Sequence, residues 1–158
     1  MPNKISLSQI EAAQTAWADG IISIGQRWQD KKDYHAAAKD FISTHYAYDY
    51  ECGTVLFKPT KVQDQSFRAT LESALSYFVG GNLSYAEDNG FALAPWRSIT
   101  FENHGVYQHH DIATVMGHYE FTDHALNKTR VEYTFGYLST EKGRLKIFLH
   151  HSSLPYRG

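Results

Sequence analysis

The stretch Ile147-Phe148-Leu149-His150-His151-Ser152-Ser153-Leu154-Pro155-Tyr156 contains the last apolar run of the chain, which turns polar after three residues. In a β-strand, side chains alternate between two faces. Lys146 falls on the same face as Phe148, which predicts that the opposite face points inward. That inward face carries Ile147, Leu149, His151 and Ser153. The stretch therefore predicts a final strand that brings a histidine and a serine into the interior at the open end of a sheet.

Two alternatives stay open for this strand. A bulge among His150 to Ser152 would reverse the two faces and turn the other histidine and serine inward. A frayed edge strand would instead leave all of these polar side chains in water. Pro155 fits the end of the strand, because it has no backbone N–H to donate to a neighbouring strand.

The first half of the chain has helical periodicity. Apolar residues spaced by three or four predict one long helix, whose stripe is Ile10, Ala13, Trp17, Ile21, Ile24 and Trp28. Asp33 can cap a second helix over 34–45, and a third helix is expected over 66–79, ended by Gly80 and Gly81. A short extended piece over 54–58 lies between these two helices.

From Trp96 onwards the period changes to two, which predicts strands. We expect a turn at 103–105, a long strand over 106–122, a strand near 130–137, and a hairpin at 141–143 before the final strand. Gly117 and Gly136 fall inside strands, where glycine indicates a bulge or a bend. Helices followed by an antiparallel meander predict an α+β fold.

Composition bounds the class of protein. A chain of 158 residues predicts one domain over 1–158 with a sizeable core. The net charge is −2 without long runs of like charge, which argues against a nucleic-acid or membrane surface. Residues 1–6 lack the apolar segment of a secretory leader, so we expect a cytoplasmic protein. The single Cys52 excludes an intramolecular disulfide and a cysteine-based zinc site.

Two familiar chemistries are poorly supported. The chain has nine histidines but no HExxH motif, and the neighbours in each adjacent pair, 109–110 and 150–151, face opposite sides of a regular strand. A catalytic triad is conceivable because serines and histidines cluster over 150–153. However, no G-x-S-x-G nucleophile elbow is present, and neighbours in sequence do not define triad geometry.

The terminal motif His150-His151-Ser152-Ser153-Leu154-Pro155 resembles the HHSS-x-P signature of the iota-class carbonic anhydrases. These proteins are also described as calcium/calmodulin-dependent kinase II association-like domains of the NTF2-like (SnoaL-like) superfamily. Segments 53–60 and 74–81 resemble the same family, and the resemblance extends from about Trp17 to Tyr156. It implies a cone, with the N-terminal helices packed in a strongly curved antiparallel sheet. It also implies a homodimer paired through the outer sheet face.

The resemblance further implies the site residues. The active centre of the family is attributed to a threonine, a tyrosine and the Ser/His of the terminal motif. Carried onto this chain, these are Thr60, Tyr77, His151 and Ser153, with Ser152 as a further substrate-binding hydroxyl. The family includes metal-free members, so we expect no cofactor and no metal here, and the resemblance implies carbon dioxide and bicarbonate as substrate and product.

Small polar groups in an apolar pocket suit this reaction. Carbon dioxide is apolar, whereas the oxygens of the product become negative and need hydrogen-bond donors. Hydroxyl groups both donate and accept, tyrosine stays protonated at neutral pH, and a histidine can carry away a released proton. Two other functions stay open. One is a non-enzymatic association domain, and the other is an NTF2-like isomerase or cyclase, which would need an inward carboxylate.

Overall fold

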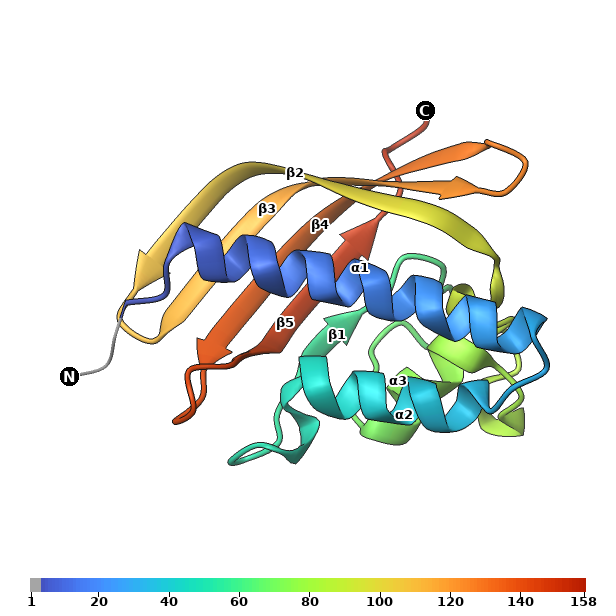
Figure 1. Ribbon diagram of the computed structural model, residues 1–158, viewed down its shortest axis with the longest axis horizontal. Helices are drawn as coiled ribbons and strands as arrows, with labels where there is room; N and C mark the ends of the chain where they lie inside the picture. The colour runs from blue at the N-terminus through green and yellow to red at the C-terminus, as the bar shows by residue number, and fades with distance from the viewer. Residues whose placement is uncertain (1–3) are drawn as a thin grey trace.

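The computed structural model describes residues 4–158. Three helices precede most of the sheet: α1 over Leu7–Gln29, α2 over Tyr34–His45 and α3 over Leu71–Val79. The long helix α1 lies across one face of the sheet, and α2 and α3 lie beside its β1 end (Figure 1). The α+β prediction is therefore confirmed, and the second helix has the predicted bounds.

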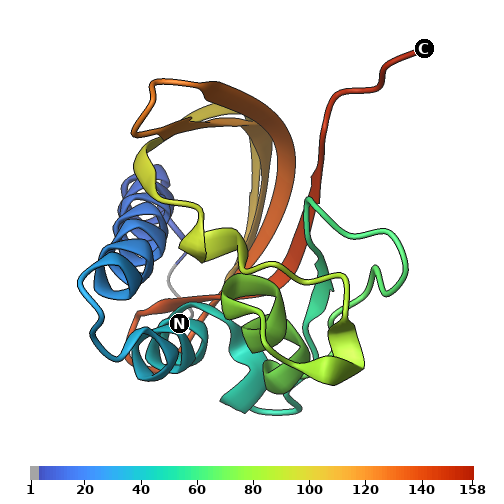
Figure 2. The ribbon, with the colours of Figure 1, turned by 90° about the vertical axis from the view of Figure 1, so that its right-hand side faces the viewer.

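One five-stranded sheet has the order β1-β5-β4-β3-β2. Its strands are β1 (Leu56–Lys58), β2 (Trp96–His109), β3 (Ile112–Asp123), β4 (Lys128–Ser139) and β5 (Leu145–Ser153). The last four form an antiparallel meander, whereas the short β1 pairs with β5 in parallel. The sheet bends strongly, as the end-on view in Figure 2 shows. Three 3₁₀ turns, Ala47–Asp49, Leu83–Tyr85 and Phe91–Leu93, occupy the connections.

The core lies between α1 and the concave face of the sheet. Trp17 from α1 is 2% exposed and stands at its centre. Its indole packs against aromatic rings from α2 and from four strands, namely Phe41, Phe101, Tyr119, Phe121, Phe135 and His150. Replacing a buried tryptophan by alanine typically costs about 3–5 kcal/mol. This aromatic core fixes how α1 sits on the sheet, and so fixes the walls of the interior.

The strand register shifts at three places, and at two of them a strand glycine lies opposite the bulge. In β2 the register shifts between Asn103 and Gly105, opposite Gly117 in β3. In β5, Phe148 has no partner, because Leu149 pairs with Gly136 while Ile147 pairs with Tyr137. A Cβ on Gly136 would lie 2.8 Å from the end of the Phe148 ring. The prediction that Gly117 and Gly136 mark bulges or bends is confirmed.

The bulge at Phe148 overturns the predicted inward face of the final strand. Before the bulge, Ile147 is buried as predicted. After it, His150 and Ser152 are buried, at 3% and 1% exposed, while His151 is exposed. Ser153 is only partly buried, as is Leu149. The prediction that His151 and Ser153 point inward is wrong, because the extra residue shifts the two-residue alternation by one.

Two further boundaries differ from the sequence prediction. Helix α3 begins at Leu71 rather than at 66, because Thr70 caps it, and before it the Arg68 N–H donates to Phe57 O of β1. Strand β2 continues through 103–105, where a turn was predicted. The chain reverses instead at His110, whose φ is 54°.

Among residues 4–158, none of the helices combines the length and the apolar character needed to cross a membrane. The expectation about the N-terminal segment falls partly on residues 1–3, which lie outside the described residues.

Candidate active site

His150 is surrounded by aromatic rings and hydroxyl groups. Its imidazole stacks on Phe135 and Phe57, with ring centroids 4.1 and 4.9 Å apart. Its Nδ1 lies 2.8 Å from the Tyr46 hydroxyl, and its Nε2 lies 2.9 Å from the Ser152 hydroxyl and 3.1 Å from the Tyr119 hydroxyl. Both ring nitrogens are therefore occupied by protein hydroxyl groups.

Tyr119 and Ser152 form the centre of this hydroxyl cluster. Tyr119 comes from β3 and Ser152 from β5, and β4 separates the two strands. Their hydroxyl groups hydrogen-bond directly to each other. Both residues are almost completely buried, so this pair has little contact with bulk water. The backbone of Ser152 is held from the other side by Lys58, whose Nζ donates to Ser152 O at 2.8 Å.

Thr60 and Tyr77 complete the cluster from the helical side. The Thr60 side chain lies beside the hydroxyl groups of both Tyr77 and Tyr119, where it opposes the rise in pKa that burial causes in each. The backbone N–H of Lys61 donates to the Tyr77 hydroxyl at 3.2 Å. The four hydroxyl groups therefore lie together: Ser152 and Tyr119 are hydrogen-bonded to each other, and Thr60 lies beside both Tyr119 and Tyr77.

The loop that carries Thr60 is held by two acidic residues. The carboxylate of Glu87 accepts hydrogen bonds from the backbone N–H groups of Gln63, Asp64 and Gln65 at 2.6–3.0 Å. Asp88 forms a bidentate ion pair with Arg68 that is completely buried. Losing one partner of a buried ion pair typically costs about 3–5 kcal/mol. Glu87 and Asp88 therefore hold the loop 60–70 against the rest of the cluster.

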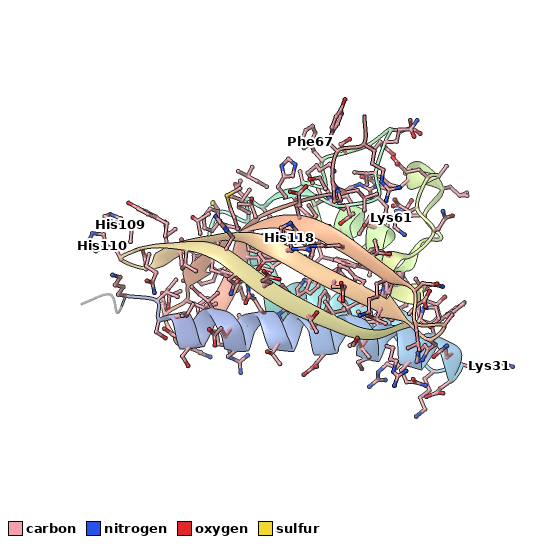
Figure 3. All side chains as sticks on the ribbon, turned by 90° about the horizontal axis from the view of Figure 1, so that it is seen from above. Lys31, Lys61, Phe67, His109, His110 and His118 are labelled. Atoms are coloured by element: carbon pink, nitrogen blue, oxygen red, sulfur yellow. The ribbon has the colours of Figure 1, made fainter. Side chains whose placement is uncertain are left out.

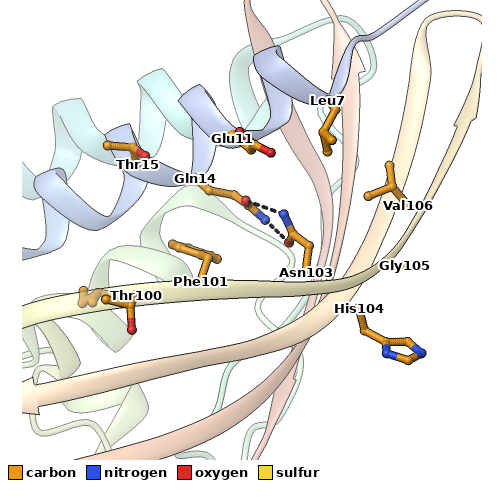
Figure 4. Close-up of a pocket in the computed structure, with 11 residues that line it drawn as sticks. Leu7, Glu11, Gln14, Thr15, Thr100, Phe101, Asn103, His104, Gly105 and Val106 are labelled. Carbon is orange, nitrogen blue, oxygen red and sulfur yellow. Dashed lines mark hydrogen bonds between the residues drawn. The ribbon is translucent and has the colours of Figure 1, made fainter.

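Tyr77 links the cluster to a surface pocket of about 360 Å³. Lys61, Trp28 and Phe91 also line this pocket. A larger hollow of about 720 Å³ lies between α1 and β2, where Gln14 and Asn103 exchange two amide hydrogen bonds (Figure 4). Its lining includes none of the four hydroxyl residues, so the smaller pocket beside Tyr77 is the better candidate for the entrance.

Burial sets the protonation of the site. It holds the pKa of His150 well below its usual value of 6.5, so the imidazole is neutral at physiological pH. It also raises the pKa of Tyr46, Tyr77 and Tyr119 above the usual value of 10, and so keeps these phenols protonated. The interior thus presents neutral groups that donate and accept hydrogen bonds.

The structure brings together part of the predicted site. Thr60, Tyr77 and Ser152 lie in the cluster, whereas His151 is exposed and Ser153 is only partly buried. Sequence reasoning passed over Tyr119, although it lies on the two-residue alternation of β3 with the buried Val115 and Phe121. Tyr46, whose hydroxyl lies 2.8 Å from His150 Nδ1, was likewise not among the predicted site residues.

Metal-binding donors do not converge in the part of the chain that the structure describes. Residues 4–158 contain no group of three His, Cys, Asp or Glu side chains placed to hold one ion. His109 and His110 lie at the tip of the β2–β3 hairpin, far along the sheet from His118 (Figure 3). The donors that do converge are neutral hydroxyl groups, which are poor ligands for a divalent cation, and one imidazole whose two nitrogens both contact hydroxyl groups.

Comparisons with known proteins agree along nearly the whole chain. A family model described as metal-independent carbonic anhydrase matches residues 8–154. The metal-independent carbonic anhydrase of Nostoc sp. (strain PCC 7120 / SAG 25.82 / UTEX 2576) is 39% identical over 153 residues, which is 96% of this chain and 75% of that protein.

Solved structures show the same relationship. The crystal structure of a cyanobacterial iota-carbonic anhydrase complexed with bicarbonate has a TM-score of 0.93 and 37% identity, covering 98% of this chain and 95% of that one. A protein of the NTF2-like family from Streptomyces avermitilis, at 18% identity, has a TM-score of 0.58 over 96% of each chain and supports the fold alone. The chain therefore has the predicted NTF2-like fold and belongs to the family of metal-independent carbonic anhydrases, the iota class.

Proposed function

We propose that this carbonic anhydrase interconverts carbon dioxide and bicarbonate at the hydroxyl cluster of Thr60, Tyr77, Tyr119 and Ser152. The observation that carries the proposal is the direct contact between the Tyr119 and Ser152 hydroxyl groups beside a neutral His150. The related cyanobacterial enzyme was crystallised with bicarbonate, which supports placing the same anion in this chain. Aromatic rings of Phe101, Phe121 and Phe135 around Tyr119 offer the apolar wall that carbon dioxide needs.

The reaction can proceed without a charged base. The oxygen of a water molecule attacks the carbon of carbon dioxide, and one C=O electron pair moves onto an oxygen. One proton of the water passes to a hydroxyl oxygen of the cluster. At the same time, a hydroxyl proton of the cluster passes to the carbon dioxide oxygen. The product is neutral carbonic acid, which loses a proton to bulk water and becomes bicarbonate. The hydroxyl groups end the cycle in the protonation state in which they began.

The cluster accelerates this reaction by position and by hydrogen bonding. Fixed donors aimed at an oxygen that becomes negative are each worth about 10²–10³ in rate, because they need no reorganisation. Holding water beside carbon dioxide removes a further entropic cost. His150 acts here as a fixed neutral neighbour of the two hydroxyl groups. This role differs from the proton relay expected of His151 from the family resemblance.

Stopped-flow hydration of carbon dioxide tests the proposal. We expect Tyr119→Phe and Tyr77→Phe each to fold and to lose most of the activity, since each loses only a hydroxyl group. Tyr137→Phe is the matched control, because Tyr137 is equally buried and shows no hydrogen bond from its hydroxyl group within residues 4–158. Wild-type turnover in Tyr119→Phe and Tyr77→Phe would refute the assignment of the site.

The isomerase alternative lacks a free carboxylate in the described interior. The buried carboxylate of Asp88 is bound by Arg68 on both oxygens and accepts a further hydrogen bond from Ser76. It is therefore committed to holding the loop and is a poor general base.

Three other predictions concern how the protein is organised. The homodimer is tested by light scattering after size-exclusion chromatography, where a larger ring would favour the association-domain alternative. The single domain over 1–158 is tested by limited proteolysis. The cytoplasmic location is tested by cell fractionation.

A further inference from the structure

Tyr46 lies behind His150, on the side away from Ser152 and Tyr119. A single parallel bridge pairs its backbone with Ile147 of β5, and its side chain is completely buried. Its hydroxyl group has two hydrogen-bond partners in the described structure. The Trp17 Nε1–H donates to it at 3.2 Å, and His150 Nδ1 lies 2.8 Å away.

Counting protons in this contact assigns the tautomer of His150. An indole nitrogen only donates, so Trp17 cannot receive the proton of the Tyr46 hydroxyl. The remaining acceptor among its partners is His150 Nδ1, which must therefore carry no proton. The opposite tautomer would make Tyr46 accept twice and leave its own O–H buried without a partner, which is strongly disfavoured.

A neutral imidazole without a proton on Nδ1 carries it on Nε2. The Nε2–H then points at the two hydroxyl groups of the reaction centre, Ser152 at 2.9 Å and Tyr119 at 3.1 Å. His150 is therefore a donor to this pair and offers it no acceptor.

We propose that Tyr46 and Trp17 are positioning residues that lock His150 as the Nε2–H tautomer and thereby direct one hydroxyl proton of the Tyr119–Ser152 pair towards the substrate. The role in turnover rests on the proposed function, while the tautomer itself rests on the hydrogen-bond geometry alone.

The direction follows from the number of protons. Tyr119 and Ser152 together have two hydroxyl protons, and their mutual hydrogen bond uses one of them. The second cannot go to His150, because Nε2 already carries a proton. It must point away from the histidine, either to the substrate or towards Thr60, which lies beside Tyr119. In the tautomer with its proton on Nδ1, His150 Nε2 would accept this second proton. The Tyr119–Ser152 pair would then have no hydroxyl proton left to donate to the substrate.

Nitrogen NMR of the wild-type protein tests the tautomer without any substitution. In protein labelled with ¹⁵N-histidine, with His150 assigned through its backbone resonances, we expect a protonated Nε2 and an unprotonated Nδ1 across pH 6 to 9. A protonated Nδ1, a fast mixture of tautomers, or a charged imidazolium within this range would overturn the inference.

The Tyr46→Phe variant tests the positioning role. It removes the donor to Nδ1 while keeping the ring stacked near Phe57 and His150. Groups that orient a functional histidine through its second nitrogen, as in metal sites, typically change activity about 10–100-fold when removed. We expect a fall of about tenfold in kcat with little change in KM, together with a shift of the His150 nitrogen resonances towards a mixture of tautomers.

Tyr137→Phe is the control, and it should leave both kcat and the His150 resonances unchanged. A Tyr46→Phe variant that folds and keeps wild-type kcat would overturn the positioning role. If Tyr46→Phe fails to fold, the tautomer in the wild-type protein still decides the inference. A wild-type protein with the Nε2–H tautomer but no carbon dioxide hydration would instead contradict the proposed function.

Discussion

His150 is paired across the sheet with Phe135, and its imidazole stacks on that phenyl ring with the ring centroids 4.1 Å apart and the planes 24° apart. This pairing exists because the unpaired residue in β5 shifts the register by one position. Without the shift, His151 would face the interior. A single extra residue in a strand therefore decides which histidine and which serine of the terminal motif enter the candidate active site.

The two neighbouring serines give a direct test of this placement. We expect Ser152→Ala to lower kcat by about 10²–10³, because it removes a fixed hydroxyl group beside the developing charge. Ser153→Ala should stay near wild type, because Ser153 points to the opposite side of the strand. Stopped-flow carbon dioxide hydration measures both variants, and circular dichroism checks that each is folded. Equal losses in the two variants would show that the hydroxyl of Ser152 has no special role.

The pH dependence of the rate distinguishes a neutral site from one with a titrating base. Burial holds the pKa of His150 well below 6.5 and the pKa values of Tyr77 and Tyr119 above 10. Between these limits none of the three groups changes charge. The value of kcat/KM for carbon dioxide hydration should therefore not depend on pH from about pH 6.5 to 9.

The reverse reaction supplies a check on the same mechanism. Since the equilibrium between carbon dioxide and bicarbonate releases one proton, kcat/KM for bicarbonate dehydration should fall about tenfold for each unit of rising pH over this range. A sigmoidal hydration profile with a midpoint near pH 7 would contradict the neutral mechanism and indicate a titrating base.

Much of the fold follows from local sequence patterns. The helical stripe that includes Trp17 and the two-residue alternation after Trp96 predicted α1 and the sheet, because burying one face requires that spacing. The glycines at 117 and 136 marked the bends correctly. The start of α3 was misplaced, because Thr70 caps the helix and the Arg68 N–H before it donates to Phe57 O of β1, a long-range contact that a local helical pattern does not reveal.

The candidate site was harder to predict than the fold. A sequence pattern does not specify which residue of β5 is left unpaired, because the bulge depends on the register that β4 imposes. The hydroxyl cluster also joins residues far apart in the chain, such as Thr60, Tyr119 and Ser152. Local periodicity could place Tyr119 on the inward face, but it could not place it beside Ser152.

Glu87 offers a test of how the Thr60 loop is held. Its carboxylate accepts hydrogen bonds from three backbone N–H groups, and these bonds lower its pKa below 4.5. The N–H groups of Gln65 and Gln63 have the largest effects. A carboxylate whose pKa is lower in the folded than in the unfolded protein stabilises the fold at pH values above its unfolded pKa. This stabilisation is lost as the pH falls through the pKa of the folded state. We therefore expect Glu87→Gln to lower the urea midpoint and kcat at pH 7, with the stability difference narrowing below about pH 4.5.

The control for this experiment is Glu11→Gln on α1, because within residues 4–158 the Glu11 carboxylate accepts no hydrogen bond. It should leave both the urea midpoint and kcat unchanged at pH 7. A constant stability difference between wild type and Glu87→Gln from pH 7 to 4 would show that the carboxylate charge is not what holds the loop.

Removing metal should leave the activity intact. A catalytic zinc site needs about three protein ligands that converge on one ion, and the described donors do not converge in this way. Both nitrogens of His150 are already engaged by hydroxyl groups. We expect full carbon dioxide hydration after dialysis against a strong chelator, with metal below stoichiometry by elemental analysis. Activity that disappears on stripping and returns with zinc would contradict the hydroxyl mechanism, while leaving the family assignment standing.

Gly136 tests whether the bulge in β5 is what builds the site. A Cβ at this position would lie 2.8 Å from Phe148 Cζ and 2.9 Å from Leu149 Cβ, so Gly136→Ala must displace the bulged segment. Overpacking of this kind typically costs about 1–3 kcal/mol, which urea unfolding can measure. Because His150 and Ser152 follow the bulge directly, kcat should fall along with stability.

Gly105→Ala is the matched control for that substitution, since Gly105 also lies at a strand bulge but, among residues 4–158, no atom lies within 4 Å of an added Cβ. Adding Phe148→Leu to Gly136→Ala should restore part of the lost stability and part of the lost kcat. The reason is that it removes the ring atom that lies closest to the new methyl group. If Gly136→Ala loses stability but keeps full kcat, the position of His150 and Ser152 does not depend on this bulge. The register argument for the active site would then be wrong.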